Sequence, residues 1–212
     1  MQRPTFIARQ AARPAGIVGR LLLRVMSLET SRFNAAVLDA LAPSSGDRIL
    51  EVGYGHGRTL AAAAQRAPDA WFSGIDLSSD AARVTARRCR MLPAERLDLR
   101  VGDSAAMPWV DGSFDKVFSV HTIYFWSEPS QHLREMCRVL RPGGRLALGF
   151  RERDEAVTAT FPAEVYRFPS VDEVSSLLVA AGFDAVNVDR GDVGPGLCIA
   201  TAVAGHAPSS PT

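Results

Sequence analysis

The chain alternates between two hydrophobic patterns along most of its length. Short apolar runs, typical of strands in a parallel sheet, predict strands at 48–52, 71–76, 97–102, 116–120, 145–150, 185–189 and 197–202. Between them, apolar residues recur at helical spacing and predict helices at 33–41, 61–67, 81–90, 130–140 and 170–181. This alternation is typical of an α/β domain in which helices cover both faces of a mostly parallel sheet.

The C-terminal third departs from this regular alternation. The last two predicted strands are separated only by a short turn rich in glycine and proline, so we expect one antiparallel edge. Residues 151–169 are polar and contain prolines, which predicts a loop or lid. The spacing of Ser170 and Glu173 predicts a capping box at the start of the helix that follows.

Composition limits the class of protein. At 212 residues and 47% hydrophobic, the chain suits a single domain with a sizeable core. A formal net charge of +1 gives no electrostatic reason to expect a nucleic-acid partner. The three cysteines are far apart in sequence and have no histidine at ligand spacing. We therefore expect no disulfide framework, no metal site and a reducing, cytoplasmic setting.

The first residues have a composition of their own. Residues 1–28 contain five arginines and no acidic residue, a composition found in transit peptides and in helices that lie on anionic lipid. We interpret them instead as a basic arm or lid helix packed over the domain. Membrane contact by residues 1–28 stays open as the alternative. The apolar runs of the chain fall short of the roughly 20 residues that a membrane span needs.

The segment Ile49–Gly57 carries the strongest chemical signal. It reads as a strand, then Glu51, then glycines at positions 53, 55 and 57, and it leads into an alanine-rich helix. Glycines at this density let the backbone turn tightly and approach a ligand closely. Because open α/β sheets bind ligands at the carboxyl ends of their strands, this segment indicates a cofactor that contains a nucleoside.

Two aspartates follow the next two predicted strands. Asp76 can accept hydrogen bonds from both hydroxyls of a ribose, or it can cap the following helix, a role that Ser78 can also fill. Asp103, followed by Ser104, can accept from an adenine amino group or simply form a turn. Leu77 can pack against an adenine ring or belong to the core.

The glycine spacing separates two classes of cofactor. A dinucleotide enzyme requires G-x-G-x-x-G, whereas this chain has G-x-G-x-G with Arg58 at the position of the third glycine. The carboxylate of Glu51 would repel a diphosphate and attract an ammonium group. A cofactor with an amino-acid moiety and a sulfonium centre therefore fits better than NAD.

These motifs resemble those of class I S-adenosylmethionine (SAM) methyltransferases of the small-molecule type, such as the quinone-biosynthesis methyltransferases. The resemblance runs from about residue 46 to 150 and rests on segments 49–57, 74–76, 102–109, 111–117 and 138–146. It implies a Rossmann-like sheet of seven strands, mostly parallel, with the last strand antiparallel and helices on both faces. It also implies SAM as the cofactor.

The resemblance assigns roles to individual residues. It places Glu51 and the three glycines on the methionine moiety, Asp76 on the ribose and Asp103 on the adenine. The expected cofactor-binding set is Glu51, Gly53, Tyr54, Gly55, His56, Gly57, Asp76, Leu77, Asp103, Ser104 and His121. The sequence departs from the family at positions 54 and 56, where a small residue and Thr or Pro are frequent.

The sequence gives weaker evidence for the residues that bind the methyl acceptor. His121 directly follows the fourth predicted strand and is our candidate catalytic base, with a structural or cofactor-side role as the alternative. The aromatic residues Tyr124, Trp126 and Tyr166 are expected to bind the acceptor, although core packing would also account for them. His132 is expected on a helix surface.

The sequence thus predicts an enzyme that moves a methyl group by in-line displacement to O, N, S or C of a small molecule. The expected layout is a basic arm with helices over 1–45, forming a lid over the acceptor site, a SAM-binding methyltransferase domain over 46–204 and a disordered tail over 205–212. Two alternatives are an NAD-type oxidoreductase and a SAM-binding regulatory protein without catalysis. The oligomeric state stays open.

Overall fold

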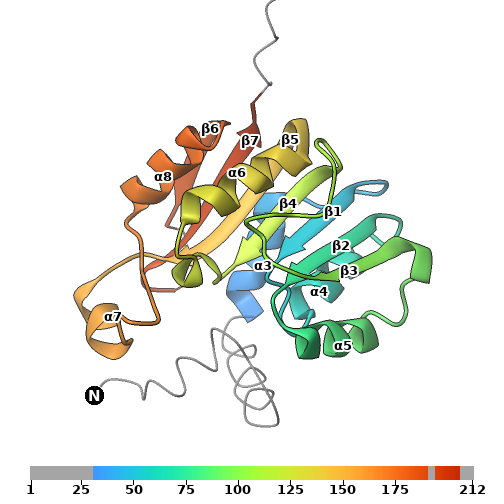
Figure 1. Cartoon of the computed structure of the whole chain (residues 1–212), viewed down its shortest axis with the longest axis horizontal. Helices are drawn as coiled ribbons and strands as arrows, with labels where there is room; N and C mark the ends of the chain where they lie inside the picture. The colour runs from blue at the N-terminus through green and yellow to red at the C-terminus, as the bar shows by residue number, and fades with distance from the viewer. Residues whose placement is uncertain (1–30, 191–193, 206–212) are drawn as a thin grey trace, which may run out of the picture.

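The computed structural model describes residues 31–190 and 194–205. Within them, one sheet has the strand order β3-β2-β1-β4-β5-β7-β6 (Figure 1). The strands are β1 (Arg48–Val52), β2 (Trp71–Asp76), β3 (Leu97–Val101), β4 (Phe114–Val120), β5 (Leu140–Arg151), β6 (Phe183–Asp189) and β7 (Leu197–Ala204). The α-helices are α3 (Ser31–Leu41), α4 (Arg58–Arg66), α5 (Ser79–Arg88), α6 (Pro129–Val139), α7 (Glu155–Thr160) and α8 (Val171–Ala180).

The predicted fold class is confirmed, with one difference at the edge of the sheet. Strands β1 to β5 pair in parallel, and β7 runs antiparallel to both β5 and β6. The antiparallel strand is therefore one position in from the edge, which β6 forms. Most side chains of β7 are buried, whereas β6 is largely exposed, so the more apolar strand takes the place that is covered on both sides.

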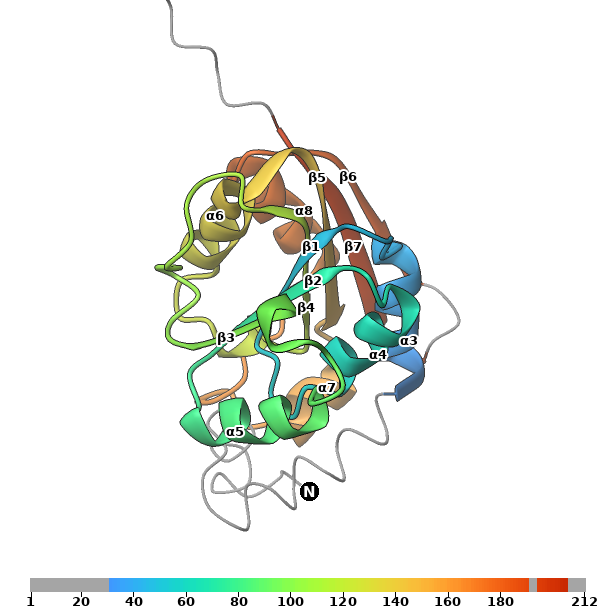
Figure 2. The same ribbon diagram turned by 90° about the vertical axis from the view of Figure 1, so that its right-hand side faces the viewer.

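Helices cover both faces of the sheet, as the alternating pattern predicts. Helices α6 and α8 lie on one face, while α3, α4 and α5 lie on the other, so that Figure 2 shows three layers. Each face has its own core. The first is built around Leu133, Met136 and Leu178, and the second around Phe33 and Leu60.

The predicted loop at 151–169 contains a short helix. Asp154 accepts a hydrogen bond from the backbone N–H of Val157 at 2.6 Å and so begins α7. The predicted loop or lid therefore contains one short helix, which the polar composition of the segment did not indicate. The capping box that begins α8 is confirmed, with reciprocal hydrogen bonds between Ser170 and Glu173.

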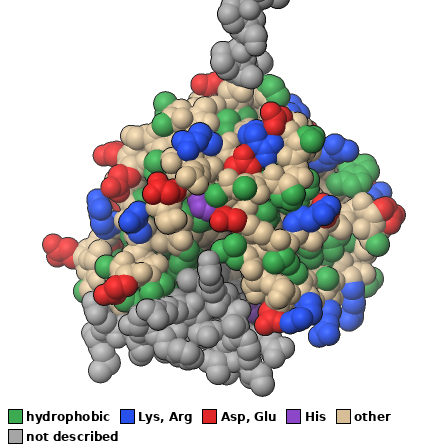
Figure 3. Space-filling model, viewed as in Figure 1, with side chains coloured by type: hydrophobic (Ala, Val, Ile, Leu, Met, Phe, Trp, Pro, Cys, Tyr) green, Lys and Arg blue, Asp and Glu red, His purple; other side chains and the backbone are tan. Residues whose placement is uncertain are grey.

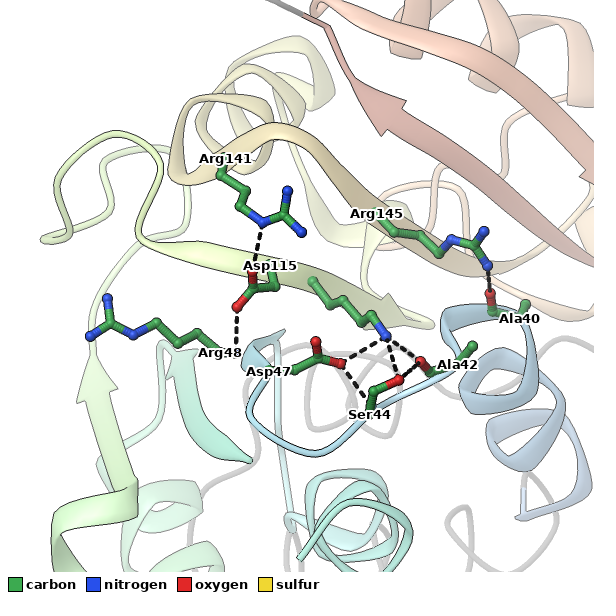
Figure 4. A network of polar contacts seen from close by, with 9 residues as sticks. Ala40, Ala42, Ser44, Asp47, Arg48, Asp115, Arg141 and Arg145 are labelled. Carbon is green, nitrogen blue, oxygen red and sulfur yellow. Dashed lines mark hydrogen bonds and ion pairs between the residues drawn. The ribbon is translucent and has the colours of Figure 1, made fainter. Parts of the chain in front are cut away.

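Ion pairs and caps hold the amino ends of β1, β4 and β5 to the end of α3 (Figure 4). Lys116, the only lysine of the chain, contacts Asp47 at 2.7 Å and donates to the carbonyl of Ala42 just after α3. Asp115 accepts from the Arg48 N–H at 2.8 Å and from Arg141 Nε at 2.6 Å. Although partial burial raises the pKa of Asp115, these two donors lower it overall.

Surface and composition give further limits. Acidic and basic side chains are interspersed over most of the face in Figure 3. In the described part of the chain, no helix has the length and apolar character to cross a membrane. The described residues also hold no group of three or more His, Cys, Asp or Glu placed to bind a metal ion. The predicted arm over 1–28 and, from the predicted tail over 205–212, residues 206–212 lie outside the described residues.

Candidate functional site

The three glycines between β1 and α4 adopt the left-handed conformation, with φ of +76° at Gly53, +47° at Gly55 and +66° at Gly57. A Cβ on Gly53 would lie 2.3 Å from Thr122 Cγ2, and one on Gly57 would lie 2.4 Å from Thr85 Cγ2. A Cβ on Gly55 would meet nothing within 4 Å. Two glycines therefore let the loop pack tightly, while Gly55 leaves space beside the backbone for a ligand.

Asp76 ends β2 and connects two neighbouring loops. Its Oδ2 accepts from the Gly55 N–H and its Oδ1 from the Ser78 N–H, both at 2.9 Å. The side chain of Ser78 caps α5 by accepting from the Ala81 N–H at 3.2 Å. Burial raises the pKa of Asp76, although the two backbone donors oppose this effect. Since Ser78 fills the capping role, each oxygen of Asp76 keeps lone pairs that can accept from a ligand.

Glu51 is buried at the carboxyl side of β1 and is 3% exposed. The backbone N–H of Leu60 donates to its carboxylate. Among the described residues its Oε2 has no hydrogen-bond partner. Burial, and then the charge of Asp76, raise the pKa of Glu51 well above its usual value. A buried oxygen without a donor requires an explanation, and a cationic ligand group that donates hydrogen bonds would supply one.

The ends of β2 and β3 lie next to each other, because the Gly102 N–H donates to the Asp76 carbonyl at 3.0 Å. Beyond them, the side chain of Asp103 is 60% exposed, and its Oδ1 accepts from the Ala105 N–H at 2.9 Å. Leu77 is 51% exposed. An exposed leucine beside a carboxylate suits the apolar ring and the polar edge of a purine.

Two predicted cofactor residues have their hydroxyl groups bonded within the protein. Tyr54 is buried, and its hydroxyl donates to the Arg100 carbonyl at 3.0 Å. Ser104 is also buried, and its hydroxyl lies 2.7 Å from His132 Nδ1. At position 56 the guanidinium of Arg88 donates to the histidine carbonyl. The hydroxyls of Tyr54 and Ser104 thus support the loops that surround the site.

His132 is buried on α6, so the prediction that it lies on a helix surface is wrong. It is 7% exposed, and its ring stacks on Trp126 with centroids 4.6 Å apart. Burial lowers its pKa, although the charge of Asp103 acts in the opposite direction. A signal was present in the sequence, because His132 has helical spacing with Met136 and Val139, which are both buried. The ring of Trp126 therefore packs on His132 within the same core cluster that contains Tyr124 and Tyr166.

His121 follows β4 directly and has an unusual backbone, with φ of +59°. A non-glycine residue in this region is strained, and such strain is frequent at functional sites. Its Nδ1 lies 2.9 Å from the hydroxyl of Tyr124, and its ring centroid lies 5.0 Å from that of Phe33. Burial, and then the charge of Arg151, lower the pKa of His121 to about 4. The imidazole is therefore neutral at pH 7.

An aromatic cluster extends from His121 into the segment after β5. The ring of Tyr124 lies 4.6 Å from Phe168 and 6.4 Å from Tyr166, measured between centroids. Phe161 packs against both Tyr166 and Phe168. The structure thus brings together the predicted acceptor residues Tyr124 and Tyr166.

Two polar residues that the sequence did not predict also shape the loop. Thr85 is fully buried on α5, and its hydroxyl donates to the Gly55 carbonyl at 3.1 Å. Ser119 is also fully buried, and its hydroxyl donates to the Val52 carbonyl at 2.7 Å. Only the placement of a polar residue inside an otherwise apolar strand, as at Ser119, could have indicated this role.

The fold is that of a mostly parallel α/β protein, and Glu51, Asp76 and the glycine loop lie together at the carboxyl ends of β1 and β2. Comparison with known proteins indicates which class of α/β protein this is. Residues 50–148 match the family described as "Methyltransferase domain". This match, together with the relatives below and the seven-stranded fold, supports a class I SAM-dependent methyltransferase.

Individual relatives agree with this assignment. The chain is 27% identical over 175 residues to the uncharacterized methyltransferase YdaC of Bacillus subtilis, covering 82% of this chain and 92% of the relative. It is 31% identical over 156 residues to the O-methyltransferase cnsE of Penicillium expansum, covering 70% of this chain but only 56% of that protein. The fold is similar to that of a SAM-dependent methyltransferase from Thermotoga maritima, with a TM-score of 0.70, 21% identity and coverage of 93% and 99%.

Proposed function

We propose that this chain binds SAM at the carboxyl ends of β1 to β3 and transfers its methyl group to a small molecule held near His121. The observation that supports this most strongly is Glu51, a buried carboxylate whose Oε2 has no partner among the described residues. The ammonium of an amino-acid moiety supplies both the charge and the donor that this oxygen lacks.

The remaining contacts fit the rest of the same cofactor. The start of α4 has no side-chain cap, so apart from the Leu60 N–H that donates to Glu51, the backbone N–H groups of its first turn are available to a carboxylate. The open space at Gly55 admits the chain of the cofactor. Asp76 accepts from the ribose hydroxyls, and Asp103 and Leu77 meet the adenine. When bound, SAM supplies a methyl group that its sulfonium already activates.

The protein mainly has to align the acceptor and exclude water, because proximity supplies much of the acceleration in such a transfer. Tyr124, Tyr166 and Phe168 offer an apolar wall for the body of the acceptor. The O-methyltransferase relative from Penicillium expansum supports oxygen as the attacked atom. Three free cysteines in the described residues support a reducing compartment, and we place the enzyme in the cytoplasm.

The cofactor assignment is tested with Asp76→Ala. Removing a carboxylate that accepts two ribose hydroxyls is expected to weaken SAM binding by roughly 10- to 100-fold, the effect of losing about 1.5–3 kcal/mol of charged hydrogen bonds. Calorimetric titration with SAM measures the change. The matched control is Asp69→Ala, because the side chain of Asp69 is 68% exposed and pairs only with Arg96. Equal SAM affinity in the two variants would contradict the assignment.

Catalysis is tested with methyl-labelled SAM and a metabolite extract. We expect a labelled small molecule to form together with S-adenosylhomocysteine. Binding of SAM without any labelled product would instead favour a regulatory protein. A protein that retains NAD and does not bind SAM would favour the oxidoreductase alternative.

A further inference from the structure

The hydroxyl of Tyr124 lies between two polar groups of other segments. The backbone N–H of Arg151, at the end of β5, donates to its oxygen. On the other side, Nδ1 of His121 lies 2.9 Å away. Since the oxygen already accepts from Arg151, the phenolic O–H is left to donate, and His121 Nδ1 is the acceptor within reach.

This arrangement sets the tautomer of His121. A neutral imidazole carries one proton, and a nitrogen that accepts a hydrogen bond cannot hold it. With Nδ1 accepting from Tyr124, the proton is on Nε2. A general base would require the opposite tautomer, in which Nε2 is unprotonated.

The Nε2 atom has a fixed position and an unused donor. It is buried and has no hydrogen-bond partner among the described residues. The backbone holds the residue in place, because the His121 N–H donates to the Gly149 carbonyl at 2.9 Å. The guanidinium of Arg151 donates to the Pro195 carbonyl at 2.9 Å, and its positive charge acts on both His121 and Tyr124. A hydrogen-bond donor and a nearby cation together favour an anion.

We propose that Tyr124 is a positioning residue that holds His121 in its Nε2–H tautomer, so that His121 donates a hydrogen bond to an acceptor that reacts as an ionised oxygen, such as a carboxylate. This proposal rests on the proposed function and specifies the acceptor of the same site. The aromatic cluster of Tyr124, Tyr166 and Phe168 then holds the apolar body of the acceptor.

The transfer of the methyl group to an ionised oxygen balances without a general base. The acceptor oxygen supplies the electron pair of the new O–C bond, and the C–S bond breaks with its pair left on sulfur. The negative charge of the acceptor and the positive charge of the sulfonium are both removed. No proton is released, so the enzyme needs a donor that orients the oxygen and no group that takes up a proton.

The tautomer is measured by long-range ¹H–¹⁵N NMR on the full chain saturated with S-adenosylhomocysteine. At pH 7 we expect His121 Nδ1 at the shift of an unprotonated nitrogen and Nε2 at that of a protonated one. In Tyr124→Phe both nitrogens are expected to move toward the averaged shifts of exchanging tautomers. Tyr166→Phe removes a hydroxyl from the same cluster and is expected to leave the tautomer unchanged. A wild-type His121 protonated at Nδ1 would overturn the proposal.

The acceptor class is measured by calorimetric titration of the same complex with benzoate and with its neutral analogue benzamide. We expect benzoate to bind at least tenfold more tightly, an effect of about 1.4 kcal/mol. His121→Gln retains a donor near the Nε2 position and is expected to keep benzoate binding, whereas His121→Ala is expected to lose about tenfold.

The outcomes separate the two proposals. Equal affinities for benzoate and benzamide, no saturable benzoate binding, or equal losses in His121→Gln and His121→Ala would each overturn the ionised acceptor. Failure of the proposed function would show differently, because the wild-type protein would then bind neither SAM nor S-adenosylhomocysteine.

Discussion

At the scale of single residues, the burial of Glu51 lowers the stability of the free protein, and the same carboxylate is proposed to bind the cofactor. Its folded-state pKa is raised by burial, so the folded protein holds the proton more tightly than the unfolded chain does. The stability from this group is therefore present at low pH and is lost as the pH rises from the usual value toward the raised one. At pH 7, which is above the usual pKa of a glutamate, the burial of Glu51 therefore destabilises the free protein.

Glu51→Gln tests this assignment. We expect the free variant to be more stable than the wild type at pH 7, by about 1–3 kcal/mol, because the neutral amide avoids the extra cost of burying an ionisable carboxyl that lacks a full set of donors. The difference should shrink as the pH falls toward 4, and SAM binding should weaken because the ammonium loses its counter-charge. Denaturant unfolding at several pH values, together with SAM titration, measures both effects.

Glu135→Gln is the matched control with the opposite sign. Hydrogen bonds from Arg138, and then from the Met107 backbone, lower the pKa of Glu135, although burial opposes them. Its stability is therefore present above its usual pKa and is lost as the pH falls through the lowered one. The control variant should be less stable than the wild type at pH 7. A destabilised Glu51→Gln protein would contradict the role of Glu51.

Single residues also show what the sequence could and could not predict. Acidic residues at the ends of two strands were predictable, because the end of a parallel strand fixes where its next side chains lie. The inward position of Ser104 was not, since it depends on His132 in a distant helix. Likewise, no local pattern shows that the Tyr124 hydroxyl meets both His121 and the Arg151 backbone.

At the scale of secondary structure elements, α6 is joined to the loop after β3. The hydrogen bond between Ser104 and His132 connects them, and Met107 donates its N–H to Glu135 at 2.7 Å. This loop carries Asp103, the residue proposed to meet the adenine. The position of the adenine contact therefore depends on how α6 packs on the sheet.

Ser104→Ala tests this connection. It leaves Nδ1 of the buried His132 without its hydroxyl partner, and we expect a loss of about 1–3 kcal/mol in the free energy of unfolding. SAM binding should weaken as well, because the loop loses its support. Denaturant unfolding and SAM titration measure the two effects.

The control is Ser113→Ala in an exposed turn. That hydroxyl donates to the Val110 carbonyl at 2.6 Å, where water can replace it. Its loss should cost less than that of Ser104 and should leave SAM binding unchanged. Similar losses in both variants would show that the connection between α6 and the loop does not support the site.

Strands were more predictable than the irregular segments between them. Each of the seven predicted strands overlaps an observed one. A strand that is covered on both faces, such as β1, is apolar along most of its length, whereas the more exposed β3 alternates apolar and charged residues. The short helix α7 was missed, because its six residues show no apolar periodicity. The place of β7 inside the sheet was also missed, since strand order depends on long-range packing.

At the scale of the whole molecule, the two ends of the sheet differ in kind. The carboxyl ends of the strands carry the buried Glu51 and the half-buried Asp76, two acids whose pKa values burial raises. The amino ends carry Lys116 and Asp115, which are paired with groups of opposite charge. One end is therefore arranged for a ligand, and the other stabilises the fold.

Lys116→Met is the prediction that follows from this division. It removes the pair with Asp47 and the cap on the end of α3, so we expect a loss of about 1.5–3 kcal/mol in the free energy of unfolding. Because Lys116 is at the opposite end of β4 from His121, SAM affinity should not change. When Lys116→Met is combined with Glu51→Gln, the two changes in unfolding free energy should add to within about 0.5 kcal/mol, as expected of sites without shared partners. A larger deviation, or weaker SAM binding in Lys116→Met alone, would show that the two ends of the sheet are coupled.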